Sequence, residues 1–140
     1  MTALQTSIDF DKFHLTLVEN GIIENYVKPG VLIEAADAWE IKRQNLILSD
    51  QKEYCVLVVS GHLSSVSKEA REVVASREFI GKTLAKALLV DSLGHRIVGN
   101  FYLSVNKPKI KTKTFSDRTE ALKWLRNQLN KKKKKKVSSN

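Results

Sequence analysis

The stretch YCVLVVS, Tyr54 to Ser60, decides how this chain folds. Nearly all of its residues are apolar, and polar and apolar residues do not alternate as they do in a strand with one wet face. A strand with this pattern is buried on both faces. A second run of the same kind, LAKALLVD, follows at Leu84 to Asp91. Together the two runs predict a mostly parallel sheet covered by helices.

Two shorter β-type runs precede the first buried strand, at His14–Glu19 and Ile22–Val27. Asn20-Gly21 between them predicts a two-residue hairpin, because both residues tolerate positive φ. Pro29-Gly30 ends the second run. A helix is expected from about Ile33 to Leu48, although its apolar stripe is not clean. The sheet is therefore expected to begin with an antiparallel pair.

Three further helices and one strand are expected downstream. The second helix begins near Ser67, and the third runs from about Leu93 to Asn106, where Pro108 stops it. A short strand at Ile110–Phe115 and a last helix, capped by Ser116-Asp117, complete the chain. The predicted order is β-β-α-β-α-β-α-β-α. This is a single α/β domain with a mixed, mostly parallel sheet covered by helices.

Length and composition are those of a soluble globular protein. The chain has 140 residues, enough for one domain, with 42% hydrophobic and 28% charged residues. No signal peptide is expected from the start, MTALQTSIDF, and no apolar run is long enough to cross a bilayer. The one cysteine, Cys55, excludes an intramolecular disulfide and fits a reducing cytosol. A cytoplasmic location is therefore expected, without membrane insertion.

The net charge of +9 belongs mainly to the end of the chain. Lys131–Lys136 carry six of these charges, which leaves +3 for the rest. The segment NKKKKKKVSSN offers only Val137 for packing. We therefore expect a folded domain over residues 1–130 and a disordered lysine-rich tail over residues 131–140. The tail is either a solvated end that aids solubility or a contact for nucleic acid or an anionic membrane.

Several strings along the chain resemble a known fold family. YVKPG (Tyr26–Gly30), SVSKEARE (Ser65–Glu72), KALLVDS (Lys86–Ser92), GNFYLSVNKP (Gly99–Pro108) and TFSDRTEALKWL (Thr114–Leu125) are similar to segments of bacterial STAS-related proteins. Over about residues 10–126 the chain thus resembles the SpoIIAA-like fold of STAS domains. The resemblance implies that fold and a regulatory module that acts through protein–protein contacts.

Anti-sigma-factor antagonists with this fold carry a phosphorylatable serine in a D-S-S-G-like turn at the start of the second helix. In this chain the resemblance places the phosphoacceptor position on Lys68, the preceding acidic residue on Ser67 and the glycine on Ala70. The motif is absent, so the resemblance does not predict a kinase-controlled switch. Ser67 is instead expected to cap the helix, because serine readily accepts from the free N–H groups there.

The predicted third helix carries apolar residues opposite its core stripe. Gly99 would let another backbone approach closely, and aromatic residues such as Tyr102 favour interfaces. Either this face contacts a partner, or the helix lies deep and packs on both sides. Combined with the start of the second helix, it gives the expected partner surface: Ser64, Ser65, Ser67, Lys68, Arg71, His95, Gly99, Tyr102 and Leu103.

Three alternating lysines, Lys109, Lys111 and Lys113, share one face of the last strand. With the lysine tail they are candidate contacts for an anionic partner. Lysines also block pairing at an exposed sheet edge. No aromatic residues are interleaved with them, as single-strand binders require. Nucleic-acid binding is therefore the less favoured interpretation.

No catalytic constellation stands out in the sequence. Asp91, Ser92 and His95 are close together, but no G-x-S-x-G elbow accompanies them. The histidines lack metal-site spacing, and no glycine-rich phosphate loop is present. We therefore expect no enzyme, metal or cofactor. The leading hypothesis is a module that binds a protein partner or itself, as a homodimer; a binding protein for a small apolar ligand or lipid is the alternative.

Overall fold

The computed structural model describes the backbone of residues 6–90 and 110–138 and the side chains up to residue 132. A six-stranded sheet in the order β1-β2-β3-β5-β7-β8 forms the middle layer, and β4 and β6 form a separate two-stranded sheet. In chain order the elements are β1 (Ser7–Asp9), β2 (Phe13–Glu19), β3 (Ile22–Val27), β4 (Leu32–Ile33), α1 (Ala35–Leu48), β5 (Tyr54–Ser60), β6 (Ser65–Val66), α2 (Lys68–Ala75), the short 3₁₀ helix η1 (Arg77–Phe79), β7 (Thr83–Leu89), β8 (Lys111–Phe115) and α4 (Arg118–Ser138).

The first three strands are antiparallel, and the predicted hairpin is confirmed. β2 and β3 pair from Phe13↔Val27 to Glu19↔Ile22, so Asn20-Gly21 alone makes the turn. Gly21 has φ +86°, a conformation that residues with a side chain rarely adopt. The short strand β1, which the sequence did not indicate, extends this antiparallel half of the sheet.

The second half of the sheet is parallel, as the two apolar runs predicted. β3 pairs with β5, β5 with β7 and β7 with β8, all in parallel. β5 coincides with the predicted run, and its first four residues are buried. β3 and β5 come together closely where they end, because the Gly61 N–H donates to the Val27 carbonyl at 2.7 Å. A Cβ on Gly61 would lie 2.6 Å from the Pro29 nitrogen, so only glycine fits there.

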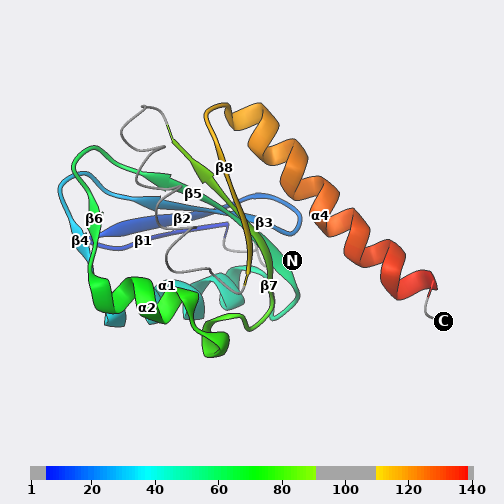
Figure 1. Ribbon diagram of the computed structural model, residues 1–140, viewed down its shortest axis with the longest axis horizontal. Helices are drawn as coiled ribbons and strands as arrows, with labels where there is room; N and C mark the ends of the chain where they lie inside the picture. Colours follow the sequence, from blue (N-terminus) through cyan, green and yellow to red (C-terminus); the bar gives the residue numbers. More distant parts are fainter. Residues whose placement is uncertain (1–5, 91–109, 139–140) are drawn as a thin grey trace.

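The helices lie on opposite faces of the sheet. Figure 1 shows α1 and α2 side by side on one face and α4 on the other, and α4 packs on β5, β7 and β8. Each face has its own core. The expected α/β class, with a mixed and mostly parallel sheet covered by helices, is confirmed.

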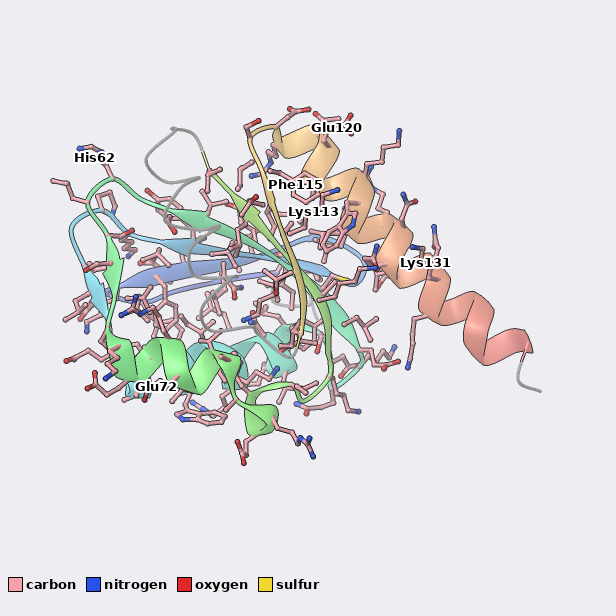
Figure 2. All side chains as sticks on the ribbon, in the orientation of Figure 1. His62, Glu72, Lys113, Phe115, Glu120 and Lys131 are labelled. Carbon is pink, nitrogen blue, oxygen red and sulfur yellow. The ribbon has the colours of Figure 1, made fainter. Side chains whose placement is uncertain are left out.

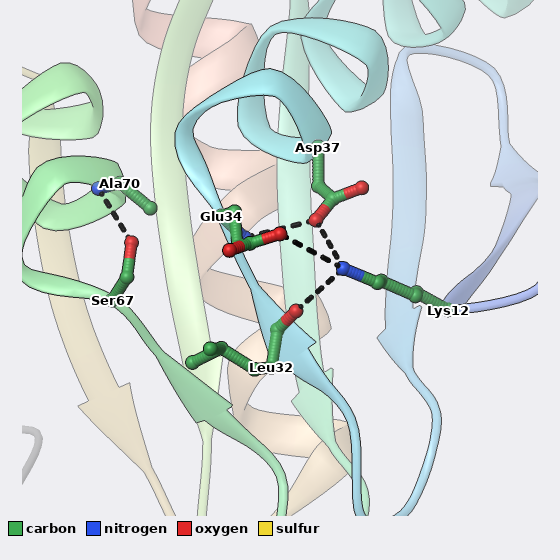
Figure 3. A network of polar contacts seen from close by, with 6 residues as sticks. All are labelled: Lys12, Leu32, Glu34, Asp37, Ser67 and Ala70. Atoms are coloured by element: carbon green, nitrogen blue, oxygen red, sulfur yellow. Dashed lines mark hydrogen bonds and ion pairs between the residues drawn. The ribbon is translucent and has the colours of Figure 1, made fainter.

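Both helices on the first face have fixed starts. Lys12, in the turn between β1 and β2, donates to Asp37 Oδ2 at 2.8 Å and to the Leu32 carbonyl at 2.9 Å (Figure 3). The same Asp37 oxygen accepts from the Glu34 backbone N–H at 2.9 Å. The hydrogen bond to Asp37 is the main reason that the pKa of Lys12 is raised. This network connects the first turn of α1 to the turn between β1 and β2.

The start of α2 matches the sequence prediction. Ser67 is its N-cap, and the Ser67 hydroxyl accepts from the Ala70 N–H at 3.1 Å (Figure 3). At the start of α4, Asp117 accepts from the backbone N–H groups of Thr119 and Glu120, as the predicted cap requires.

The end of the chain differs from the expectation. Residues 131–140 were expected to be disordered, but α4 continues through the lysine run to Ser138. Lysine is a good helix former, and the buried Ala121 and Leu125 have already nucleated the helix on the sheet. Each further residue then adds a backbone hydrogen bond without a new nucleation cost. The helix predicted at Leu93–Asn106 lies outside the described residues.

Candidate functional site

A cavity of about 540 Å³ lies between α1, α2 and the face of the sheet that these helices cover. Strands β3, β5, β7 and β8 all contribute to its walls. Most of the lining is apolar, as shown by Val27, Ile41, Val56, Val58, Leu88 and Ile110. Cavities of this size and character are typical of small-molecule sites.

The sheet places a lysine in the floor of this cavity. In the parallel register Val56 of β5 pairs with Lys86 of β7, which pairs with Thr112 of β8. Residues paired in this way point to the same face of a sheet. Lys86 therefore stands between Val56 and Thr112, and all three line the cavity.

The helix α1 contributes the opposite wall. Ala38, Ile41, Lys42 and Asn45 line the cavity, and their spacing of three and four residues puts them on one helix face. That face contains a lysine and an asparagine, which explains why the sequence shows no clean apolar stripe here. Lys42 is 6% exposed, so a charged group lies inside the protein.

The two lysines meet at one aromatic ring. The Nζ atoms of Lys42 and Lys86 lie 4.9 and 4.8 Å from the ring centroid of Phe79, which is supplied by η1. Lys42 also donates to the Ile80 carbonyl at 2.6 Å and to the Thr83 hydroxyl at 2.5 Å. Among residues 6–90 and 110–132, no carboxylate forms an ion pair with either amine.

The surroundings make both lysines weaker bases than usual. Burial lowers the pKa of Lys42 to about 8. Burial, with repulsion from Lys42, lowers the pKa of Lys86 to about 7. Lys86 borders the cavity and keeps a partly exposed surface. Near pH 7 about half of the Lys86 amines have therefore lost their proton, whereas most Lys42 amines keep theirs.

Other polar groups that line the cavity either form hydrogen bonds with each other or lack a hydrogen-bond partner in the described part of the chain. Asn25 and Asn45 donate to each other through their side-chain amides, at 2.8 and 3.0 Å. Arg71 lines the α2 side, and its Nε is buried without a hydrogen-bond partner in the described part of the chain. The lining thus offers basic groups at two places and a fixed amide pair between apolar walls.

The structure divides the residues expected in the partner surface. Ser64, Ser65 and Arg71 line the cavity. Ser67 caps α2, and Lys68 is exposed at the start of that helix. The other expected residues, His95, Gly99, Tyr102 and Leu103, lie outside the described residues.

The expected anion contacts are on the other face of the sheet. Lys111 and Lys113 are exposed on β8, an edge strand, and alternate with Thr112, which lines the cavity. Lys113 lies 5.3 Å from the ring centroid of Phe115, beside α4 (Figure 2). Lys109 lies outside the described residues. These positions fit the protection of a sheet edge.

The sequence interpretation did not identify Lys42, Lys86 and Phe79. One signal was available, because Lys86 interrupts the apolar run LAKALLV and therefore faces a covered side of the sheet. The Lys42 position was harder to find, since lysine on a helix usually faces water. Only the packing of α1 on the sheet brings the two amines together.

Comparison with known proteins places the chain in a family. A model described as "Domain of unknown function (DUF7793)" matches residues 16–129. The chain belongs to this family. No curated protein matches its sequence.

A solved structure supports the fold. The chain is similar to the crystal structure of an uncharacterized protein of the DUF3478 family, with a SpoIIAA-like fold, from Shewanella loihica PV-4. The match has a TM-score of 0.52 and 10% sequence identity, and it covers 85% of this chain and 90% of that one. The SpoIIAA-like fold that the sequence resemblance predicted is therefore confirmed.

The described residues contain neither a candidate membrane-spanning helix nor a candidate metal-binding cluster. No helix among them is long and apolar enough to span a membrane. No group of three or more histidine, cysteine, aspartate or glutamate side chains in the same residues is placed to hold a metal ion.

Proposed function

We propose that this protein is a non-enzymatic binding module for a small, largely apolar ligand, which occupies the cavity between α1, α2 and the sheet. The observation that supports the proposal is the cavity itself, with a volume of about 540 Å³ and mostly apolar walls. Small-molecule sites have volumes of about 300–1,000 Å³ and a few polar groups among apolar ones. The sequence offers this function as the alternative to a protein-binding role.

Binding without chemistry agrees with the groups around the cavity. General acid–base catalysis needs a partner that takes up or supplies a proton, whereas a lowered pKa by itself makes an amine more nucleophilic. Lys42 and Lys86 have no such carboxylate partner among the described residues. Cys55 belongs to the core on the α4 side, and burial raises the pKa of its thiol to about 12, which leaves it unreactive.

The test is the binding of a neutral fluorescent probe, N-phenylnaphthylamine, to the full chain. We expect saturable binding that is lost in Val58→Trp, because the larger side chain fills the cavity. Leu32→Trp adds the same ring at a position that is 45% exposed and serves as the control. The proposal is wrong if the wild-type chain does not bind the probe, or if Val58→Trp binds it as tightly as wild type.

A protein contact is the second candidate, and one surface feature favours it. Leu32, Leu63 and Val66 are 45%, 75% and 43% exposed, and they lie on or beside the small β4–β6 sheet. Leu63 also has φ +61°, which is rare for a residue with a side chain. Exposed apolar residues grouped in this way are typical of an interface.

The test of this second candidate is the molar mass of the chain in solution. Light scattering after size exclusion should give a dimer for the wild type and a monomer for Leu63→Glu. A wild-type monomer at high micromolar concentration would remove self-association as the use of this surface.

A further inference from the structure

We propose that the ligand carries one carboxylate head group on an apolar chain, and that Lys42 and Lys86 hold this head group at the Phe79 end of the cavity. The inference rests on the proposed ligand-binding function and names the class of ligand.

The charged side chains in the described lining of the cavity are all basic. The basic side chains in its lining are Lys42, Arg71 and Lys86, and the described lining includes no aspartate or glutamate. Positive groups that face a largely apolar space without a counter-ion are costly, because burial disfavours the charged form. An anionic head group would remove this cost, whereas a cationic one would increase it.

Within the described part of the chain, the amine of Lys42 retains one N–H donor that is free to bind a ligand. An ammonium group has three N–H donors, and Lys42 uses two of them on Ile80 and Thr83. The Nζ atoms of Lys42 and Lys86 each lie within 5 Å of the Phe79 ring centroid, and they are close enough for repulsion from Lys42 to contribute to the lowered pKa of Lys86. Two amines beside one ring suit the two oxygens of a carboxylate.

The walls of the cavity away from the lysines are mainly apolar. Beyond the lysines, Val56, Val58 and Leu88 line the sheet side of the cavity, and Ile41 lines the helix side. A sugar or a polyphosphate would leave many oxygens against these side chains without partners. An alkyl chain satisfies the same walls by burial alone. The cavity therefore fits a molecule with one charged end and an apolar remainder.

The state of the lysines adds a pH dependence to this binding. Among the described residues, the ionisable groups that accompany Lys86 are Lys42 of α1 and Arg71 of α2 in the cavity lining and Tyr54 of β5, whose ring centroid lies 5.7 Å from the Lys42 Nζ. Burial lowers the pKa of Lys86 to about 7 and that of Lys42 to about 8. A carboxylate should therefore bind more weakly as the pH rises past 8, because the amines that attract it lose their protons.

The experiment compares three ligands with the same alkyl chain: dodecanoate, dodecanol and dodecylammonium. Each is titrated against the full chain at pH 7, and displacement of N-phenylnaphthylamine is measured. We expect dodecanoate to bind at least about tenfold more tightly than dodecanol, in line with a charge-assisted hydrogen bond. Dodecylammonium should bind most weakly of the three.

Lys86→Met tests whether Lys86 binds the carboxylate head group, since methionine keeps the apolar stem and removes the charge. It should bring the affinity for dodecanoate down to that for dodecanol. Lys111→Met removes a lysine from the exposed edge strand on the other face and should leave the preference unchanged. Lys86→Gln serves as a second variant, and circular dichroism confirms that each variant is folded.

The outcomes separate this inference from the proposed function. If probe and ligands all fail to bind, the ligand-binding function itself is wrong. If dodecanol binds as tightly as dodecanoate, the cavity binds ligands but the carboxylate inference is wrong. The inference is also wrong if folded Lys86→Met and Lys86→Gln keep the full preference for dodecanoate.

Discussion

The two faces of the central sheet are closed in different ways. On the α4 side seven residues are completely buried: Ile22, Cys55, Leu57, Ala85, Ala87, Ala121 and Leu125. On the α1 and α2 side the same strands border a cavity of about 540 Å³ that contains two lysines. The face covered by α4 has a fully buried core, whereas the face covered by α1 and α2 borders a cavity.

The difference arises from alternate residues of the same strands. β7 presents Ala85 and Ala87 to α4, and their small side chains let Ala121 come close. One residue further along, Lys86 points to the other face. A single strand thus packs one core with one set of residues and lines the cavity with the other, because side chains alternate between the faces.

The largest expected effect contrasts a leucine on each face. Leu125→Ala should lower the free energy of unfolding by about 3–4 kcal/mol, since it opens a void in a fully packed core. Leu88→Ala should cost less, about 1–2 kcal/mol, because Leu88 already borders an empty space. Urea denaturation at pH 7 measures both. Equal losses would show that the two faces are packed alike.

The next effect concerns the amide pair in the cavity wall. Asn45→Ala should destabilise the protein by about 1–3 kcal/mol, because it leaves the buried Asn25 amide without its partner. Replacing both residues, as in Asn25→Val with Asn45→Leu, should recover part of this loss. Urea denaturation of the single and double variants tests this, and a double variant less stable than Asn45→Ala would contradict the explanation.

The third effect, counted per pH unit, is the pH dependence of stability that Lys86 causes. The pKa of Lys86 is about 7 in the folded chain, below the ordinary value of 10.5. Between these two pH values the unfolded chain binds more protons, so the free energy of unfolding rises with pH, by at most about 1.4 kcal/mol per pH unit. Below pH 7 the penalty of the buried charge is fully present.

Lys86→Met removes this contribution and isolates it from the other titrating groups. The variant should therefore be more stable than the wild type at pH 6, and the gap should shrink steadily towards pH 10. The measurement is the difference in unfolding free energy between the two proteins along this pH range. A constant gap would mean that Lys86 titrates normally in the folded protein.

The smallest effect tests a helix start on the open face. Ser67→Ala should cost about 1 kcal/mol, since it removes the hydroxyl that accepts from the Ala70 N–H. Ser65→Ala is the control at an exposed position. Thermal unfolding followed by circular dichroism compares the two, and equal melting temperatures would contradict the capping role.

Much of the architecture could be predicted from local patterns. The run Tyr54–Ser60 is confirmed as a buried parallel strand, and Asn20-Gly21 as the hairpin turn. The Ser67 cap and the SpoIIAA-like fold are confirmed as well. The strand, the turn and the cap depend on neighbours in sequence, namely on period, turn chemistry and capping, whereas the SpoIIAA-like fold was implied by the resemblance of several strings to a known family.

The sequence by itself determined the class of the fold, the β2–β3 hairpin, the parallel strands β5 and β7 and the absence of the phosphoserine motif at Lys68. Only the tertiary structure decided that Lys42 of α1 and Lys86 of β7 meet at Phe79 inside a cavity. It also decided that α4 extends through the lysine run. The physical reason is that burial and electrostatic coupling depend on which faces pack together, and residues 44 positions apart come together only after the sheet and its helices have formed.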